Sequence, residues 1–197
     1  MVNVPTVGVL ALQGAFREHL NIFDSLGVNT RGVRTSADLA GLDALAIPGG
    51  ESTTMSRLAA DLGVLEPVAD VVRSGLPTLG TCAGMIMLAD EVIDGRSDQQ
   101  SFGGLQIAVR RNAFGRQSES FEAQVSMPVL GEPAFPGVFI RAPWVEQASE
   151  SVEVWGQVER PEGSRIVAVR QGPVVATAFH PELADDDRVH RKFLSLI

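Results

Sequence analysis

The single cysteine of this sequence lies in a pattern typical of an activated nucleophile. Cys82 is the centre of "GTCAG" (80–84), with Gly80 and Gly84 two positions away on either side. The spacing matches the G-x-S-x-G nucleophile elbow with sulfur in place of oxygen, and glycines are needed there because other side chains would collide with neighbouring backbone. A thiol at the N-terminus of the following helix is stabilised as a thiolate. The alternative is a small buried apolar side chain, the commoner role of a lone cysteine.

A cysteine nucleophile needs a base, and the base needs a group that orients it. The sequence has three histidines, of which His180 follows the buried run "VVATAF" and begins "HPEL". Glu182 lies two residues on, so its side chain can point the same way and accept the imidazole N–H. By itself "HPE" is equally typical of a strand-to-loop turn. We expect His19, on a polar helix face, and His190, among basic residues, to be solvent-exposed.

The segment "PGGESTT" (48–54) supplies a third element, again at the end of a buried run. Paired glycines let backbone N–H groups turn toward a developing oxyanion, where one such donor contributes roughly 2.7–4 kcal/mol. The N–H groups of Gly50 and Ala83 are the natural pair. The same residues would also form a tight turn before a helix capped by Ser52 or Thr53.

Short apolar runs alternate with helical periods in the first half of the chain, which predicts a parallel α/β sheet. Strands are expected at 6–12, 28–33, 42–50 and 76–81, and helices at 16–27, 52–63, about 65–74 and 83–90. From about 100 to 180, valine-rich strands separated by Gly/Pro turns indicate a mixed or antiparallel extension of the same sheet. The end, 185–197, predicts a helix with acidic residues in its first turn.

The predicted organisation is therefore one domain over residues 1–197. Its fold class is a three-layer α/β fold, in which helices cover both faces of an open, mixed but mainly parallel sheet. A chain of 197 residues is long enough to bury such a core.

Charge and composition limit the classes of partner. The sequence has 24 acidic and 16 basic residues and a net charge of −8. This balance argues against a nucleic-acid surface or an anionic membrane as the main partner. No stretch approaches the roughly 18 apolar residues of a membrane-spanning helix. A lone cysteine forms no internal disulfide, so we expect a reducing, cytoplasmic setting.

The elbow, the "HPE" and the "PGGES" loop together resemble the triad-type (class I) glutamine amidotransferases, which implies a flavodoxin-like fold. In detail, the residues of these and other motifs are similar to one branch of that family, the glutaminase subunits of pyridoxal 5'-phosphate synthase. "RNAFGRQ" and "FIRAP" are not general amidotransferase features, and they make the resemblance specific. The matching blocks span nearly the whole chain: 8–19, 47–58, 80–89, 110–123, 138–143 and 179–183.

The resemblance implies roles for individual residues. Cys82 would attack the side-chain amide carbon of L-glutamine, His180 would move the proton and activate water, and Glu182 would orient His180. Glutamine contacts would fall at Gly50, Glu51, Ser52, Arg111, Ile140 and Arg141. For two of these residues the side-chain chemistry agrees with the implied role: Arg111 can pair with the substrate α-carboxylate and Glu51 with its α-ammonium group. Taken alone, Arg111 is equally typical of a surface cation.

The resemblance also implies a partner. Ammonia would pass to a separate synthase subunit, in a hetero-oligomer that makes pyridoxal 5'-phosphate in vitamin B6 biosynthesis. Gln13 would lie in a loop near the active site that responds to this partner. Pyridoxal phosphate would be the product of the complex. No cofactor and no metal site are expected, since G-x-G-x-x-G, the P-loop and metal-ligand spacings are absent.

Three alternatives remain open at this point. The chain could be the glutaminase subunit of another amidotransferase, such as imidazole glycerol phosphate synthase. It could be a non-catalytic redox or stress-response module on the same fold. It could also be a free-standing carbon–nitrogen hydrolase or cysteine peptidase, for which activity would not depend on a partner.

Overall fold

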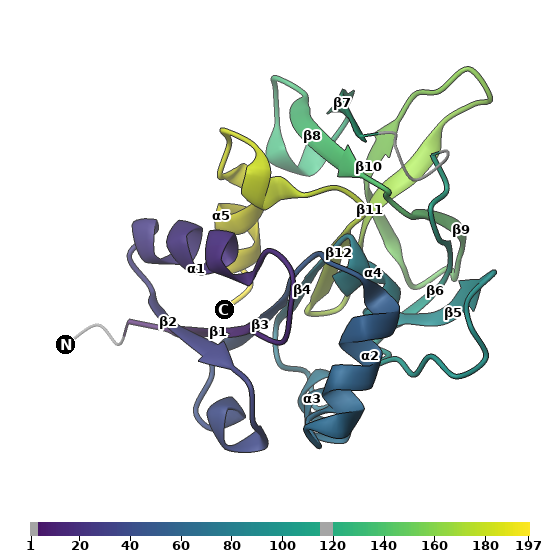
Figure 1. Cartoon of the computed structure of the whole chain (residues 1–197). Helices are drawn as coiled ribbons and strands as arrows, with labels where there is room; N and C mark the ends of the chain where they lie inside the picture. Colours follow the sequence, from purple (N-terminus) through teal and green to yellow (C-terminus); the bar gives the residue numbers. More distant parts are fainter. Residues whose placement is uncertain (1–3, 115–119) are drawn as a thin grey trace.

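Ten strands pair in one curved sheet at the centre of the molecule (Figure 1). The computed structural model describes residues 4–114 and 120–197. The sheet order is β2-β1-β3-β4-β12-β11-β9-β6-β5, with β10 paired to β11. The strands are β1 Thr6–Leu10, β2 Asn29–Val33, β3 Ala44–Ile47, β4 Thr78–Thr81, β5 Ala89–Ile93, β6 Leu105–Arg110, β7 Ser120–Val125, β8 Phe135–Ile140, β9 Trp144–Ala148, β10 Glu153–Val158, β11 Arg165–Gln171 and β12 Val174–Thr177.

Helices cover the two faces of this sheet. Figure 1 shows α1 and α5 together on one side of β1 and β3, and α2 and α3 on the other. Phe23 of α1 contacts His190 and Phe193 of α5, which fastens the first helix to the last. The α-helices are α1 Phe16–Ser25, α2 Ser52–Asp61, α3 Leu65–Arg73, α4 Ala83–Leu88 and α5 Arg188–Leu194, and the 3-10 helices are η1 Ser36–Leu39, η2 Pro128–Leu130 and η3 Pro181–Leu183.

The central strands form from the continuous apolar runs of the sequence. β3, β4 and β12 are buried at every residue, as expected of strands with a covered sheet face on each side. β1, β3, β4 and β12 pair in parallel, so their carboxyl ends share one edge of the sheet. The loops that follow these four strands are thereby brought together, which is where ligands bind in open α/β sheets.

The second half of the chain extends the sheet with antiparallel pairs. β11 pairs antiparallel with β12, β10 and β9, and β9 with β6, while β5 and β6 are parallel. The prediction of a mixed, mainly parallel α/β sheet is confirmed. One pair is separate: β7 and β8 form their own antiparallel ribbon, seen above the sheet in Figure 1.

Most predicted elements are a few residues shorter in the structure, and the differences at two helices change what surrounds them. The helix expected over 83–90 ends at Leu88, and the chain continues directly into β5 at Ala89. The last helix begins at Arg188, so its acidic residues precede it and only Asp187 serves as the N-cap.

In the part of the chain that is described, every helix is too short or too polar to cross a bilayer.

Candidate active site

The carboxyl ends of β1, β3, β4 and β12 carry Gln13, Gly50, Cys82 and His180 in the loops or turns that follow them. All but Gln13 line one pocket, which β8 and the turn after β6 close from the other side. Its volume of about 190 Å³ is below the ~300 Å³ at which pockets for drug-sized ligands begin, so it suits a molecule the size of an amino acid. The lining residues are Gly50, Glu51, Ser52, Cys82, Ile86, Arg111, Asn112, Ile140, Arg141 and His180.

Cys82 sits in the sharp turn that the sequence predicted. Its φ of 50° is a left-handed conformation that non-glycine residues rarely adopt and that is typical of strained functional turns. A Cβ at Gly80 would lie 2.8 Å from the backbone of Gly84, and one at Gly84 would collide with the carbonyl oxygen of Ile47. Both glycines are therefore required by close backbone contacts. Cys82 is 5% exposed, and its thiol donates to the carbonyl of Ile140 at 3.7 Å.

His180 and Glu182 lie side by side, as their spacing indicated. Nδ1 of His180 is 2.7 Å from Oε1 of Glu182, whose side chain is fully buried. Burial opposes the charged form of His180, but hydrogen bonds with Cys82 and Glu182 outweigh it and raise its pKa from 6.5 to about 10. Because Nδ1 of His180 is hydrogen-bonded to Glu182, its Nε2 is the nitrogen available to contact Cys82. An imidazolium between two acidic groups is the electrostatic arrangement of an activated cysteine.

The predictions for the other two histidines are wrong. His19 and His190 are both completely buried, with no exposed surface. Nδ1 of His19 is 3.1 Å from Nε2 of His190, and its Nε2 is 3.1 Å from Oγ1 of Thr81 and 3.3 Å from Oε2 of Glu182. The helix face that looks polar in the sequence packs against α5 and the end of β4, where the polar groups pair with one another.

The "PGG" turn lies directly against the side chains of Cys82 and His180. A Cβ at Gly49 would collide with the ring of His180 and lie 3.3 Å from Cβ of Cys82. The next residue, Gly50, packs against the side-chain amide of Gln13. That amide accepts from the backbone N–H of Glu51 and donates to the carbonyl of Glu51, each at 3.3 Å. Gln13 thus holds the backbone of the loop that carries the predicted oxyanion donor.

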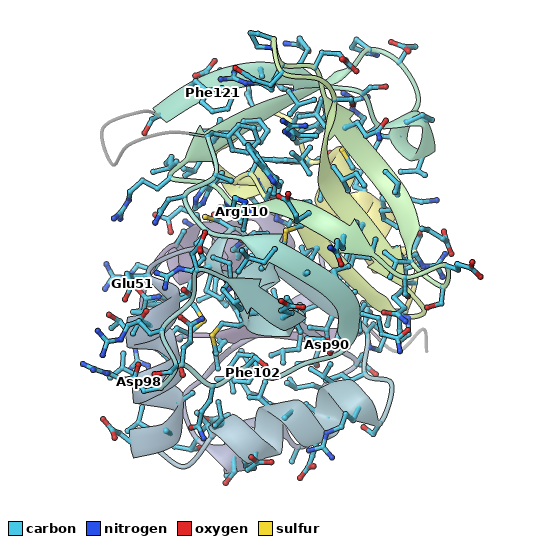
Figure 2. All side chains as sticks on the ribbon, turned by 90° about the vertical axis from the view of Figure 1, so that its right-hand side faces the viewer. Glu51, Asp90, Asp98, Phe102, Arg110 and Phe121 are labelled. Atoms are coloured by element: carbon cyan, nitrogen blue, oxygen red, sulfur yellow. The ribbon has the colours of Figure 1, made fainter. Side chains whose placement is uncertain are left out.

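Glu51, not Ser52 or Thr53, caps helix α2, which corrects the capping prediction. Its carboxylate accepts from the backbone N–H groups of Thr53 at 3.0 Å and Thr54 at 2.7 Å. Burial opposes its ionised form, but hydrogen bonds from Thr54 and Thr53 prevail and lower its pKa to about 2. Figure 2 shows Glu51 on the outer side of the molecule, between Asp98 and Phe121.

Arg111 joins this carboxylate at the mouth of the pocket. Its guanidinium donates to Oε1 of Glu51 at 3.1 Å, Oγ1 of Thr53 at 3.3 Å and Oε1 of Gln99 at 3.2 Å. The side chain of Arg111 is only 19% exposed. The neighbouring Arg110 points elsewhere and pairs with Glu146 and Asp94. Arg111 is therefore a pocket residue, whereas Arg110 is the surface cation.

Sequence reasoning missed several residues of the pocket. Ile86 and Asn112 line it, and Gln99 supports Arg111 from the loop after β5. Asn112 at φ 45° and Arg141 at φ 47° are left-handed, a conformation that clusters at functional sites, but it leaves no mark in a sequence. Across residues 4–114 and 120–197, no three His, Cys, Asp or Glu side chains are grouped to hold a metal ion.

The fold and the site together define the class of protein. A solved structure described as "Crystal structure of glutamine amidotransferase" has 48% sequence identity, covers 96% of this chain and 97% of its own, and superimposes with a TM-score of 0.86. The profile of the SNO glutamine amidotransferase family matches residues 9–197, and the chain belongs to that family. The predicted resemblance is confirmed, and the protein is a glutamine amidotransferase.

Curated relatives agree over the full length. "Pyridoxal 5'-phosphate synthase subunit PdxT" of Nocardioides sp. is 54% identical over 198 residues, covering 100% of this chain and 98% of the relative. The protein of the same name from Streptomyces avermitilis is 53% identical over 196 residues, covering 100% of this chain and 96% of the relative. In the block "RRNAFGRQSESFEA", residues 115–119 lie outside the described part of the chain.

Proposed function

We propose that this chain hydrolyses L-glutamine to L-glutamate and ammonia and passes the ammonia to the synthase subunit of pyridoxal 5'-phosphate synthase. The observation that carries the reaction is the thiol of Cys82 beside an imidazole that is hydrogen-bonded to a buried carboxylate at 2.7 Å. The acceptor is inferred from the names of the full-length relatives. The whole chain, 1–197, would act as one amidotransferase domain.

The reaction begins when the thiolate of Cys82 attacks the side-chain amide carbon of glutamine. The negative charge that forms on the amide oxygen is stabilised by the N–H groups of Gly50 and Ala83, the latter being among the free donors at the start of α4. His180 gives its proton to the leaving nitrogen, so the C–N bond breaks, ammonia departs and a glutamyl thioester remains. His180 then takes a proton from water, which hydrolyses the thioester to glutamate and restores the thiol.

The polar groups of the pocket suit the two charges of an amino acid. Arg111 offers its guanidinium to the α-carboxylate and Glu51 its carboxylate to the α-ammonium. In the described residues the buried hydroxyl of Ser52 has no hydrogen-bond partner, which leaves it free to bind substrate. Ile140 and Arg141, at the end of β8 next to Cys82, would complete the glutamine site.

We expect Arg111→Ala to raise the KM for glutamine about 10- to 100-fold with little change in kcat, since a hydrogen bond to a charged group contributes about 1.5–3 kcal/mol. Steady-state kinetics of glutamate release measures this. Arg110→Ala is the matched control, because Arg110 pairs with Glu146 and Asp94 outside the pocket. Equal effects of the two substitutions would contradict a role of Arg111 in binding glutamine.

The partner would reach the site from its open side. Gln13 bridges the β1 loop to the backbone of Glu51, so a partner that moves this loop would move the turn that carries Gly50. Such coupling would link glutamine hydrolysis to the presence of an ammonia acceptor. The complex would be a cytoplasmic hetero-oligomer, and pyridoxal 5'-phosphate would be its product, not a cofactor of this chain.

The test is glutamate release from glutamine by the purified protein, alone and with its cognate synthase subunit. We expect turnover to appear or rise at least about 10-fold when the synthase is added, and ammonia to be consumed in step with product formation. Turnover that ignores the synthase would indicate a free-standing hydrolase. A complex that forms without any turnover would mean that Cys82, His180 and Glu182 are not assembled as proposed.

A further inference from the structure

A second group of buried polar side chains lies behind the carboxylate of Glu182. His19 of α1 and His190 of α5 have no exposed surface, and neither does the Glu182 side chain. Their rings are joined between Nδ1 of His19 and Nε2 of His190 at 3.1 Å. The reaction described above uses neither histidine, and burying two imidazoles beside a carboxylate is costly unless they pair.

The two oxygens of Glu182 have different surroundings. Oε1 is bound by Nδ1 of His180 at 2.7 Å. Oε2 lies 3.3 Å from Nε2 of His19, and across residues 4–114 and 120–197 it has no well-aligned hydrogen bond of its own. A buried carboxylate oxygen needs a nearby donor to stay ionised. The His19 ring is in position to be that donor, and it shares its Nε2 with the hydroxyl of Thr81, the residue before Cys82.

The contacts of His190 determine which nitrogen of His19 carries the proton. Nδ1 of His190 has no partner among the described residues. A buried N–H without an acceptor is rarer than a bare acceptor, so the proton of His190 belongs on Nε2, where it is donated to Nδ1 of His19. His19 then holds its own proton on Nε2, the nitrogen that faces Glu182. The order of donors runs from His190 through His19 to the carboxylate.

We propose that His19 is a positioning residue of the glutaminase reaction, which presents an Nε2–H to the second carboxylate oxygen of Glu182, and that His190 fixes the tautomer that does so. This inference rests on the proposed function and deepens it. Glu182 thereby remains an anion with both oxygens engaged, and it orients and stabilises the imidazolium of His180. Removing the groups that support metal-binding histidines affects activity about 10- to 100-fold, and we expect an effect of similar size here.

The charges around the group agree with this arrangement. Burial opposes ionisation of Glu182, but His19 and then His180 outweigh it and hold its pKa well below the usual range. Burial is the main cause that lowers the pKa of His190 to about 3, so His190 stays neutral and can donate from Nε2. These groups on α1, α5 and the segment after β12 are the titratable neighbours of the carboxylate, together with Cys82 beyond His180.

Two substitutions of His19 test the proposal as a matched pair. His19→Gln keeps an N–H donor near the position of Nε2, whereas His19→Asn places its amide near Nδ1, so it keeps the contact with His190 and loses Glu182. We expect His19→Asn to lower kcat about 10- to 100-fold with KM within about 3-fold, and His19→Gln to retain most of kcat. A change confined to thermal stability, equal in both variants, would overturn the proposal.

A second readout does not need turnover. The rate of Cys82 alkylation by iodoacetamide against pH reports the thiolate that pairs with the His180 imidazolium. Without the donor, the pKa of Glu182 rises and the imidazolium is less stable, so we expect the acid limb of the profile to move to higher pH in His19→Asn but not in His19→Gln. Unchanged limbs in both variants would also overturn the proposal.

The outcomes separate this proposal from the proposed function. If the wild-type protein releases no glutamate with its synthase, the proposed function fails, and the alkylation profiles still decide the role of His19. If wild-type turnover is normal and His19→Asn matches it, only the role of His19 fails. Should His19→Asn not fold, His190→Leu and His190→Gln replace the pair. The leucine variant has no N–H to fix the tautomer of His19, so it should shift the acid limb of the alkylation profile to higher pH. The glutamine variant retains an N–H donor near the position of Nε2 and should leave that limb unchanged.

Discussion

Cys82→Ala is expected to reduce glutamate release by at least about 10³-fold in the complex with the synthase, because removing the nucleophile of a comparable set costs up to about 10⁶ in kcat. Among the described residues that line the pocket, Cys82 lies at the end of β4 with the imidazole of His180 beside it. The rest of the site stays in place, since the substitution removes one sulfur atom from a side chain that is 5% exposed. The measurement is glutamate formation under saturating glutamine.

The same variant separates chemistry from binding. Arg111, Glu51 and Ser52 are untouched, so glutamine should still bind to Cys82→Ala with an affinity close to that of the wild-type protein, as measured by calorimetry. Circular dichroism and thermal unfolding serve as the control for the fold. Residual turnover within about 10-fold of wild type, in a folded protein that binds glutamine, would exclude Cys82 as the nucleophile.

The central sheet was predictable because its strands are buried on both faces. β3, β4 and β12 have no polar face, so the sequence shows unbroken apolar runs that a helix or a half-exposed strand would not produce. The position of the site followed from the same fact, because "PGG", "GTCAG" and "HPE" each lie at the end of one of these runs. Local patterns could not indicate that β7 and β8 leave the sheet, because both alternate like ordinary half-exposed strands.

The burial of His19 and His190 was not predictable for a physical reason. Hydrophobic periodicity detects burial only through apolar residues, and a buried face made of paired polar groups looks like a solvated one. His19 and His190 are 171 positions apart in the sequence, and only the packing of α1 on α5 brings their rings to 3.1 Å. The capping of α2 by Glu51 was missed for a similar reason, because Ser52 and Thr53 are equally good local candidates.

Glu182→Gln is the second substitution with a large expected effect. The carboxylate receives His180 on one oxygen at 2.7 Å and has the His19 ring 3.3 Å from the other, so it acts as an acceptor on both sides. The amide of glutamine has one acceptor oxygen and one donor nitrogen. Its NH2 group therefore faces the N–H of either His19 or His180, or it forces His180 into the other tautomer. The equivalent change in a serine triad lowers kcat about 10⁴-fold, and we expect a comparable fall in glutamate release.

The pH dependence of stability gives this variant a second, independent readout. The pKa of His180 is raised from 6.5 to about 10 in the folded protein, so its stabilisation is complete below pH 6.5 and is lost as the pH rises toward 10. Glu182 contributes in the opposite direction: its pKa is lowered, so its stabilisation is present above its unfolded pKa and is lost in acid. Removing the carboxylate lowers the pKa of His180 and so weakens the stabilisation that its protonation provides below that pKa.

The Tm of the wild-type protein should therefore fall more steeply between pH 6.5 and 10 than the Tm of Glu182→Gln, and the two curves should approach one another at the alkaline end. Glu122→Gln is the matched control, since Glu122 lies on β7 away from the pocket and its substitution should leave both the slope and the turnover unchanged. Parallel curves for wild type and Glu182→Gln, with turnover retained, would mean that the buried carboxylate neither holds the imidazolium nor takes part in catalysis. Convergent curves together with lost turnover would assign both effects to the same ion pair, because no other carboxylate contacts the His180 ring in the described part of the chain.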